Sequence, residues 1–134
     1  MHRTTPQTIL AATALLMALA GAQAQSVIVV SHPSISLTAA EVRDVFLGEK
    51  QLAGATKLVP VDNSSLQEQF LGKLIHLDLA KYGSVWTKKS FREGLTAPAV
   101  KGSDAEVLDF VRRTPGAVGY VKASAAGVTV VTQQ

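Results

Sequence analysis

The chain has 134 residues, with 13 Lys and Arg against 10 Asp and Glu, and it contains no cysteine. The basic residues are scattered, since the longest basic runs are the pairs Lys88-Lys89 and Arg112-Arg113, so the sequence lacks the clustered basic surface of a nucleic-acid-binding protein. Without cysteine, the domain cannot be a disulfide scaffold and must be held together by a hydrophobic core.

The first 24 residues have the features of a secretory signal peptide. Arg3 supplies the positive charge, Ile9–Gly21 is an apolar run, and Ala22-Gln-Ala24 fits the small-x-small cleavage pattern. The apolar run is shorter than the roughly 20 residues that a membrane-spanning helix needs, and no later segment approaches that length. We therefore expect cleavage after Ala24 and a mature chain, residues 25–134, without a transmembrane segment. A bacterial periplasm suits such an exported domain without disulfides.

The first half of this mature chain alternates strand and helix patterns. The β-branched run Ser26–Val30 predicts a buried strand. Thr38-Ala-Ala-Glu41 is a capping box ahead of apolar residues at helical spacing, and Gly48 supplies the stop. Lys57–Val61 predicts a second strand. Ser65-Leu-Gln-Glu68 is a second capping box, and it precedes a further apolar helical stripe.

The second half continues the alternation. Asp78 is placed to cap a helix. Ser103-Asp-Ala-Glu106 is a third capping box, whose helix ends at Thr114-Pro-Gly116. Ala117–Val121 and Val128–Val131 predict the closing strands. Strands that alternate with helices indicate one α/β domain, with a mixed, partly parallel sheet flanked by helices.

The apolar stripes of these helices predict how the core is built. A helix presents residues three and four positions apart on one face, and that face packs inward. We expect the helices to pack on a sheet that contains residues 27–30 and 118–121. The predicted core residues on the helices are Phe46, Phe70, Leu74, Trp86, Val107 and Val111.

The mature chain offers few groups for catalysis. Its two histidines, His32 and His76, follow a predicted strand and a predicted helix, and both positions are typical of solvent-exposed histidines. The sequence has no HExxH or similar metal-ligand spacing, no phosphate-binding glycine loop and no dinucleotide fingerprint. We therefore expect no catalytic residue, no metal and no cofactor.

The best candidate for a ligand site is the point where the second strand pattern turns into a helix pattern. The candidate ligand-binding residues there are Asp62, Asn63, Ser64 and Ser65. A helix N-terminus directs unpaired N–H groups outward and can bind an anion, and serine hydroxyls add donors. The same pattern is explained without a ligand, since Ser65 with Glu68 forms a cap that stabilises a helix by about 1 kcal/mol. Asp62 and Glu68 also oppose an anion, and residues 58–72 contain no Arg or Lys.

Several stretches together resemble the periplasmic phosphate-binding proteins of ABC transporters and their shorter relatives. Leu37–Gly48 is similar to the segment in which that family has a Leu-Thr start and an Ile-Phe-x-Gly helix end. Val59–Leu66 stands where the family has its Arg-x-Asp-Gly-Ser-Gly-Thr phosphate loop. Phe91–Gly94 looks like the Phe-x-Gly region of the short relatives. Ser103–Leu108 and Thr114–Val121 resemble the family's closing helix and its Pro-Gly-x-Ile-Gly-Tyr-Val strand.

This resemblance implies a single lobe of the type 2 periplasmic-binding-protein fold and a relation to phosphate uptake. Within the phosphate loop only Asp62 and Ser64 match, and Pro60 stands where the family has the arginine that clamps phosphate through two hydrogen bonds. Full members enclose their ligand between two lobes. Residues 25–134 make about one lobe, so a second wall would have to come from a dimer or from another protein.

Two functions remain open from the sequence. The first is a periplasmic solute-binding-type protein that binds phosphate or another oxyanion weakly through residues 62–65. The alternative is a non-enzymatic periplasmic interaction module that retains the lobe but has lost ligand binding. Such a module would dock on an ABC transporter permease or on another periplasmic or membrane partner.

Overall fold

The structure is a computed structural model that describes residues 26–134. The predicted signal peptide, residues 1–24, and the predicted first mature residue, Gln25, lie outside the described residues. Within residues 26–134, no helix combines the length and the apolar character needed to cross a bilayer.

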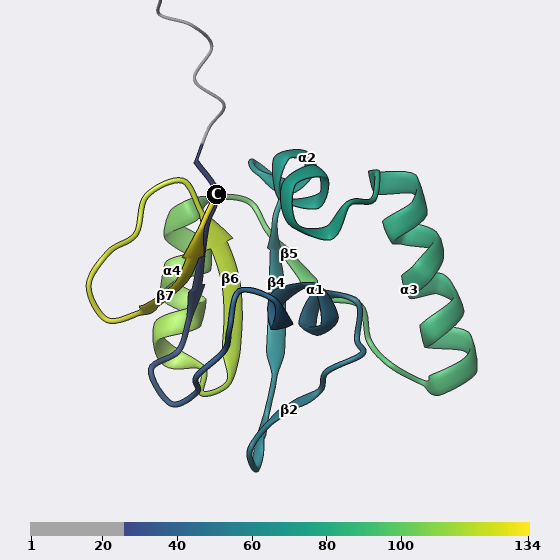
Figure 1. Ribbon diagram of the computed structural model, residues 1–134, viewed down its shortest axis with the longest axis horizontal. Helices are drawn as coiled ribbons and strands as arrows, with labels where there is room; N and C mark the ends of the chain where they lie inside the picture. The colour runs from purple at the N-terminus through teal and green to yellow at the C-terminus, as the bar shows by residue number, and fades with distance from the viewer. Residues whose placement is uncertain (1–25) are drawn as a thin grey trace, which may run out of the picture.

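Within residues 26–134, five strands form one mixed sheet, in the order β5-β4-β6-β1-β7 (Figure 1). The strands are β1 (Ile28–Ser31), β4 (Val59–Asn63), β5 (Ala99–Lys101), β6 (Ala117–Val121) and β7 (Thr129–Gln133). β4 runs parallel to both β5 and β6, whereas β1 runs antiparallel to β6 and β7. The α/β class and the partly parallel sheet predicted from the sequence are confirmed.

Helices cover both faces of this sheet. They are α1 (Glu41–Phe46), α2 (Gln67–Phe70), the π-helix η1 (Leu71–Ile75), α3 (Leu79–Glu93) and α4 (Asp104–Arg113). α4 packs on one face, and α1, α2, η1 and α3 contribute to the core on the other. A small hairpin of β2 (Leu52–Ala53) and β3 (Thr56–Lys57) projects from the lower edge of the molecule in Figure 1.

The core has two layers because successive strand residues face opposite sides of the sheet. On β1, Val29 belongs to the layer beneath α1 and α3, whereas Val30 belongs to the layer beneath α4. On β6, Tyr120 and Val121 divide in the same way. Of the six helix residues predicted for the core, Phe46, Phe70 and Trp86 lie in the first layer, Val107 and Val111 in the second, and Leu74 packs on the first while half-buried.

Two of the predicted capping boxes form at least part of their hydrogen bonds. The Glu41 N–H donates to Thr38 Oγ1 at 3.3 Å, and the Thr38 N–H donates to the Glu41 carboxylate at 2.9 Å. Ser103 Oγ accepts from the Glu106 N–H at 3.3 Å. The Glu106 carboxylate accepts from the N–H of Gly102, at 2.8 Å, one residue before the predicted donor. α4 begins directly after Ser103, as predicted, whereas α1 begins at Glu41 with Ala40 as its N-cap residue, two residues after the predicted cap Thr38.

The predicted helix cap at Ser65 is wrong. α2 begins at Gln67, its N-cap residue is Leu66, and no side chain caps it. The Ser65 hydroxyl instead donates to Asn63 Oδ1 at 2.6 Å. Asparagine side chains accept hydrogen bonds from the backbone two residues on and thereby form turns that compete with helix capping. Ser65 is therefore part of the turn that precedes the helix.

Candidate functional site

The four candidate ligand residues lie at the carboxyl end of β4 and in the turn that follows it, but they face two directions. The side chains of Asp62 and Asn63 are buried, with 1% and 0% exposure. Ser64 and Ser65 are exposed. The structure thus divides the predicted site into an inward pair and an outward pair.

Asp62 is the centre of a buried hydrogen-bond group that joins three elements. Tyr82 of α3 donates its hydroxyl to Asp62 Oδ2 at 2.8 Å, and Tyr120 of β6 donates to Oδ1 at 2.8 Å. Burial raises the pKa of Asp62 to about 6, and the two phenol hydrogen bonds oppose that rise because they favour the ionised form. Burial, followed by the charge of Asp62, raises the pKa of both tyrosines, so both phenols remain protonated donors.

The side-chain amide of Asn63 likewise has all of its hydrogen-bonding positions in use. Its Nδ2 donates to Asp104 Oδ1 at 2.8 Å and to the Tyr120 carbonyl at 3.0 Å. Its Oδ1 accepts from the Ser65 N–H at 3.1 Å and from the Ser65 hydroxyl. A side-chain amide offers two N–H donors and two acceptor positions, and all four are used here. Asn63 therefore has no hydrogen bond left for a ligand.

The backbone donors of the turn are also paired within the chain. The Ser64 N–H donates to the Lys101 carbonyl at 2.9 Å, and the Leu66 N–H donates to the Asn63 carbonyl at 3.0 Å. The Ser65 N–H is bound by Asn63, as described above. An oxyanion at this turn would therefore have to displace existing hydrogen bonds, or use only the outward hydroxyls.

Carboxylates of α4 lie at the same edge of the sheet. Asp104 accepts from Asn63 through one oxygen and from the Lys122 N–H, at 2.8 Å, through the other. Glu106 accepts from the Gly102 N–H just before the helix. The N-terminal end of a helix attracts negative charge, and here side chains of the chain itself supply it. An approaching phosphate would meet carboxylates at this edge.

The described residues show no arrangement suited to metal binding, since no group of three or more His, Cys, Asp or Glu could hold an ion among them. His32 Nδ1 is 2.8 Å from the Ser34 hydroxyl. His76 is exposed in a left-handed conformation, with φ of 60°, at the end of η1. Neither histidine belongs to the group around Asp62.

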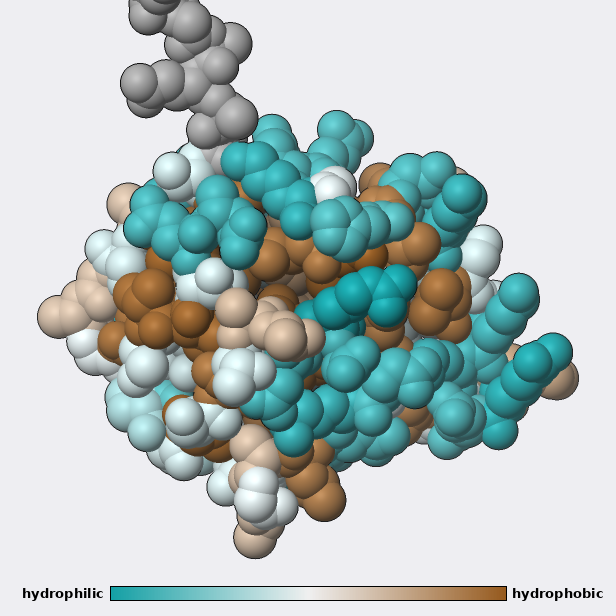
Figure 2. All heavy atoms as spheres, in the orientation of Figure 1, coloured by the Kyte–Doolittle hydropathy of each residue, from teal (hydrophilic) through white to brown (hydrophobic). Residues whose placement is uncertain are grey.

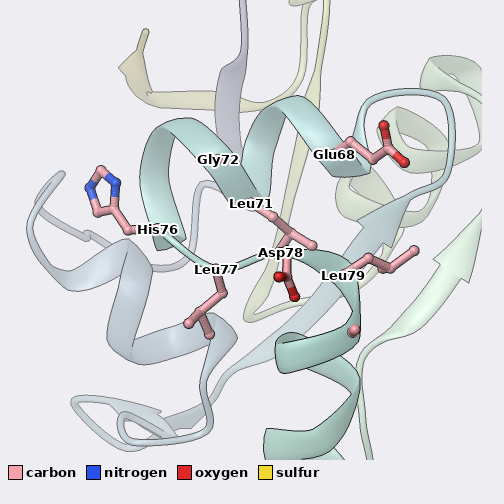
Figure 3. A pocket seen from close by; sticks show the side chains of 8 residues that line it. Glu68, Leu71, Gly72, His76, Leu77, Asp78 and Leu79 are labelled. Carbon is pink, nitrogen blue, oxygen red and sulfur yellow. The ribbon is translucent and has the colours of Figure 1, made fainter.

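A wide hollow of about 740 Å³ lies between η1 and the start of α3 (Figure 3). Its floor includes the apolar residues Leu71 and Leu77. Figure 3 shows Glu68 and His76 at opposite ends of the hollow. Asp78 caps α3 by accepting from the Lys81 N–H at 2.8 Å, which confirms the predicted cap. The polar groups of this hollow therefore do not converge on one point.

The sequence pattern does not reveal the hydrogen-bond donors of Asp62. The sequence pattern places Tyr82 on a helical stripe and Tyr120 in a strand, and it gives neither a link to Asp62. A usable signal is that an aspartate inside a strand pattern needs hydrogen-bond donors if it is buried. Tyrosines on neighbouring inward positions are natural candidates for those donors.

No family model matches the chain, and no curated protein matches it. Among solved structures, PstS from Borrelia burgdorferi is similar at a TM-score of 0.51, with 18% sequence identity over 80% of this chain and 46% of that chain. A Clostridium perfringens protein, described as a phosphate ABC transporter substrate-binding protein with bound phosphate, is similar at a TM-score of 0.57, with 15% identity over 81% of this chain and 45% of that chain. This chain thus spans less than half the length of either protein. Over that part, its fold is the periplasmic-binding-protein-like fold of these two proteins.

Proposed function

We propose that the protein is a non-enzymatic periplasmic interaction module built on one lobe of the phosphate-binding-protein fold. It acts by docking on a periplasmic or membrane partner, such as an ABC transporter permease, and not by capturing phosphate. One observation carries this proposal. The turn that stands in place of the phosphate loop has its N–H groups at Ser64, Ser65 and Leu66 paired within the chain.

The electrostatics of the turn support the same conclusion. Asp62 lies in β4 just before the turn, and Asp104 and Glu106 use donors at the same edge of the sheet. Pro60 stands where the resembling family has its phosphate-clamping arginine, and it has no charge. An anion bound there would be exposed to water, where salt screens each contact.

α3 offers an exposed surface for docking. It lies at the periphery of the molecule in Figure 1 and is anchored in the core by Tyr82 and Trp86. Phe91 is 91% exposed and borders a shallow hollow that Trp86 and Ala97 also line. Figure 2 shows hydrophobic residues reaching the surface near α2 and α3, among hydrophilic ones. Apolar surface bordered by polar residues is typical of protein-binding sites.

Calorimetric titration of residues 25–134 with phosphate, and separately with sulfate, tests the proposal. We expect no saturable heat at micromolar or low-millimolar anion. Pro60→Arg is the comparison variant, because it places a bidentate donor at the position where the resembling family has its arginine. Tight phosphate binding by wild-type monomer would contradict the proposal.

Weak oxyanion binding is the second candidate, because Ser64 and Ser65 are exposed at the turn. In that case phosphate at 100 times its dissociation constant would raise the free energy of unfolding by about 2.7 kcal/mol. Ser64→Ala and Ser65→Ala would each lose much of that gain. An equal thermal response of wild type and both variants to phosphate would exclude this candidate.

Docking can be tested with a photo-crosslinking residue at position 91, in cells that produce the protein. The matched control carries the same residue at position 124, since Ser124 is exposed in the loop between β6 and β7. We expect a specific crosslinked product from position 91 only. Identical products from both positions, or none from position 91, would count against α3 as the docking surface.

A further inference from the structure

A small cavity of about 190 Å³ lies at the amino end of β4, beside the loops that follow α1 and α3. It is separate from the polar turn, which lies at the carboxyl end of the same strand. Its volume is below the roughly 300–1,000 Å³ of sites that hold drug-sized ligands, so it would suit a small molecule.

The buried walls of the cavity are apolar and well fixed. Val45, Leu58 and Trp86 line it and are 1%, 5% and 6% exposed. The Trp86 indole N–H donates to the Phe46 carbonyl at 3.1 Å, which fixes the ring. Leu95 adds a half-buried side chain. Such walls would hold a hydrophobic group by removing its surface from water.

The charge at the cavity is positive. Lys50 and Lys57 line it, and no Asp or Glu does. Lys50 forms an ion pair with Glu41 at 3.2 Å. Lys57 is exposed and makes no ion pair with any residue in the range 26–134. Lys57 is therefore the cation available to an incoming anion.

We propose that this cavity binds a small carboxylic acid with a hydrophobic body. The body lies against Trp86, Leu58 and Leu95, and the carboxylate faces Lys57. Small-molecule sites are usually lined by apolar residues together with a small number of polar groups. The proposal goes beyond the docking function and does not depend on it, since it concerns another ligand, although Trp86 lines both this cavity and the hollow beside Phe91.

Trp86 is the only tryptophan of the chain, so its fluorescence reports on this cavity directly. Residues 25–134 would be titrated with cyclohexanecarboxylate, with the neutral cyclohexanecarboxamide and with acetate, none of which absorbs where tryptophan is excited. We expect a saturable change with cyclohexanecarboxylate, about fivefold weaker binding of the amide, and no response to acetate in the same range. No saturable change with cyclohexanecarboxylate would overturn the proposal.

Two lysine variants with the same charge change test the role of Lys57. In Lys57→Gln the acid and the amide should bind equally, because the cation that distinguishes them is gone. In Lys122→Gln the fivefold preference for the acid should persist, since Lys122 does not line the cavity. A preference that survives Lys57→Gln would overturn the assignment of the carboxylate to this residue.

A third variant tests the location. Thr96 lines the cavity and is exposed in the loop after α3, so Thr96→Phe should obstruct the site without disturbing the core. We expect loss of binding of both the acid and the amide, with an unchanged thermal midpoint. Unaltered binding in Thr96→Phe would show that the fluorescence change arises elsewhere.

Discussion

The two ends of β4 differ in how their polar groups are paired. At the carboxyl end, Asp62 and Asn63 are surrounded by hydrogen-bond partners from the chain itself. At the amino end, Lys57 stands beside an apolar cavity without an ion pair among the described residues. The polar residues of the carboxyl end thus leave few hydrogen-bonding groups for a ligand. Ligand binding depends on unsatisfied groups, and the number of polar residues alone is a poor guide to it.

The largest expected effect on stability concerns the aromatic packing of Phe70 in the core. The Phe70 ring stacks on Tyr120 with centroids 3.8 Å apart, and it meets the edge of Phe46 at 4.7 Å. Phe70→Ala should lower the free energy of unfolding by about 3–5 kcal/mol, because a buried ring is lost and a cavity remains. Phe91→Ala, the same substitution at a 91% exposed site, should change it by less than about 0.5 kcal/mol. Denaturant titration measures both, and equal losses would contradict the packing.

The next effect concerns the ionisation of Asp62. Its pKa is raised from 3.8 to about 6 in the folded protein, so the native state holds a proton that the unfolded state releases. This contribution to stability is fully present below the unfolded pKa and is lost as the pH rises through about 6. Its size is about 3 kcal/mol. Asp62→Asn cannot titrate, so wild type should lose most of that amount relative to the variant between pH 4 and pH 7.

The control for this experiment is Asp109→Asn, because Asp109 is exposed on α4. Denaturant titrations at pH 4, 5, 6 and 7 would compare each variant with wild type. We expect the difference from wild type to change with pH for Asp62→Asn and to stay nearly constant for Asp109→Asn. A constant difference for both would show that Asp62 does not hold a proton in the native state.

A third prediction compares an inward residue of the turn with an outward one. Asn63→Ala leaves Asp104, Ser65 and the Tyr120 carbonyl without their partner, so it should lower the free energy of unfolding by about 1–3 kcal/mol. Ser64→Ala removes only an exposed hydroxyl and should change it by less than about 0.5 kcal/mol. Calorimetric melting of the two variants would decide, and a larger loss for Ser64→Ala would reverse the division into inward and outward residues.

The smallest effect is expected at the amino end of β4. Lys57→Gln should alter the free energy of unfolding by less than about 0.5 kcal/mol, since the side chain is exposed and unpaired within the described residues. Lys50→Gln should lower it more than Lys57→Gln does, because it removes the surface ion pair with Glu41. Thermal melts at low and high salt would separate the two, since only the Lys50 effect should weaken as salt screens the pair.

Parts of the fold with a strong local pattern could be predicted from the sequence. β6 occupies Ala117–Val121 as expected, because an apolar segment follows a Pro-Gly stop and is buried at every position. β4 was expected at Lys57–Val61 and is found at Val59–Asn63. Asp62 and Asn63 favour turns in isolation, but they extend the strand here because buried partners satisfy them. Tertiary contacts thus place the end of β4 two residues later than local propensity predicts.

The candidate site was less predictable because its contacts are distant along the chain. Tyr82 and Tyr120 lie 20 and 58 positions from Asp62, and Asp104 lies 41 positions from Asn63. No local spacing rule covers such separations. The expected helix from Ser65 is also divided into α2 and the π-helix η1, Leu71–Ile75, and the apolar spacing does not distinguish the two.

The hydrogen bond between Tyr82 and Asp62 also makes any opening of α3 depend on pH. Because Tyr82 and Trp86 anchor α3 in the core, any transient detachment of this helix admits water to the Asp62 carboxyl. In water that carboxyl ionises at its ordinary pKa, so detachment releases a proton between about pH 4 and pH 6 and becomes easier as the pH rises through that range. The opening of α3 should then be more frequent at neutral pH than at pH 5. The amide protons of α3 should accordingly exchange with solvent faster at neutral pH, by more than hydroxide catalysis of exchange explains.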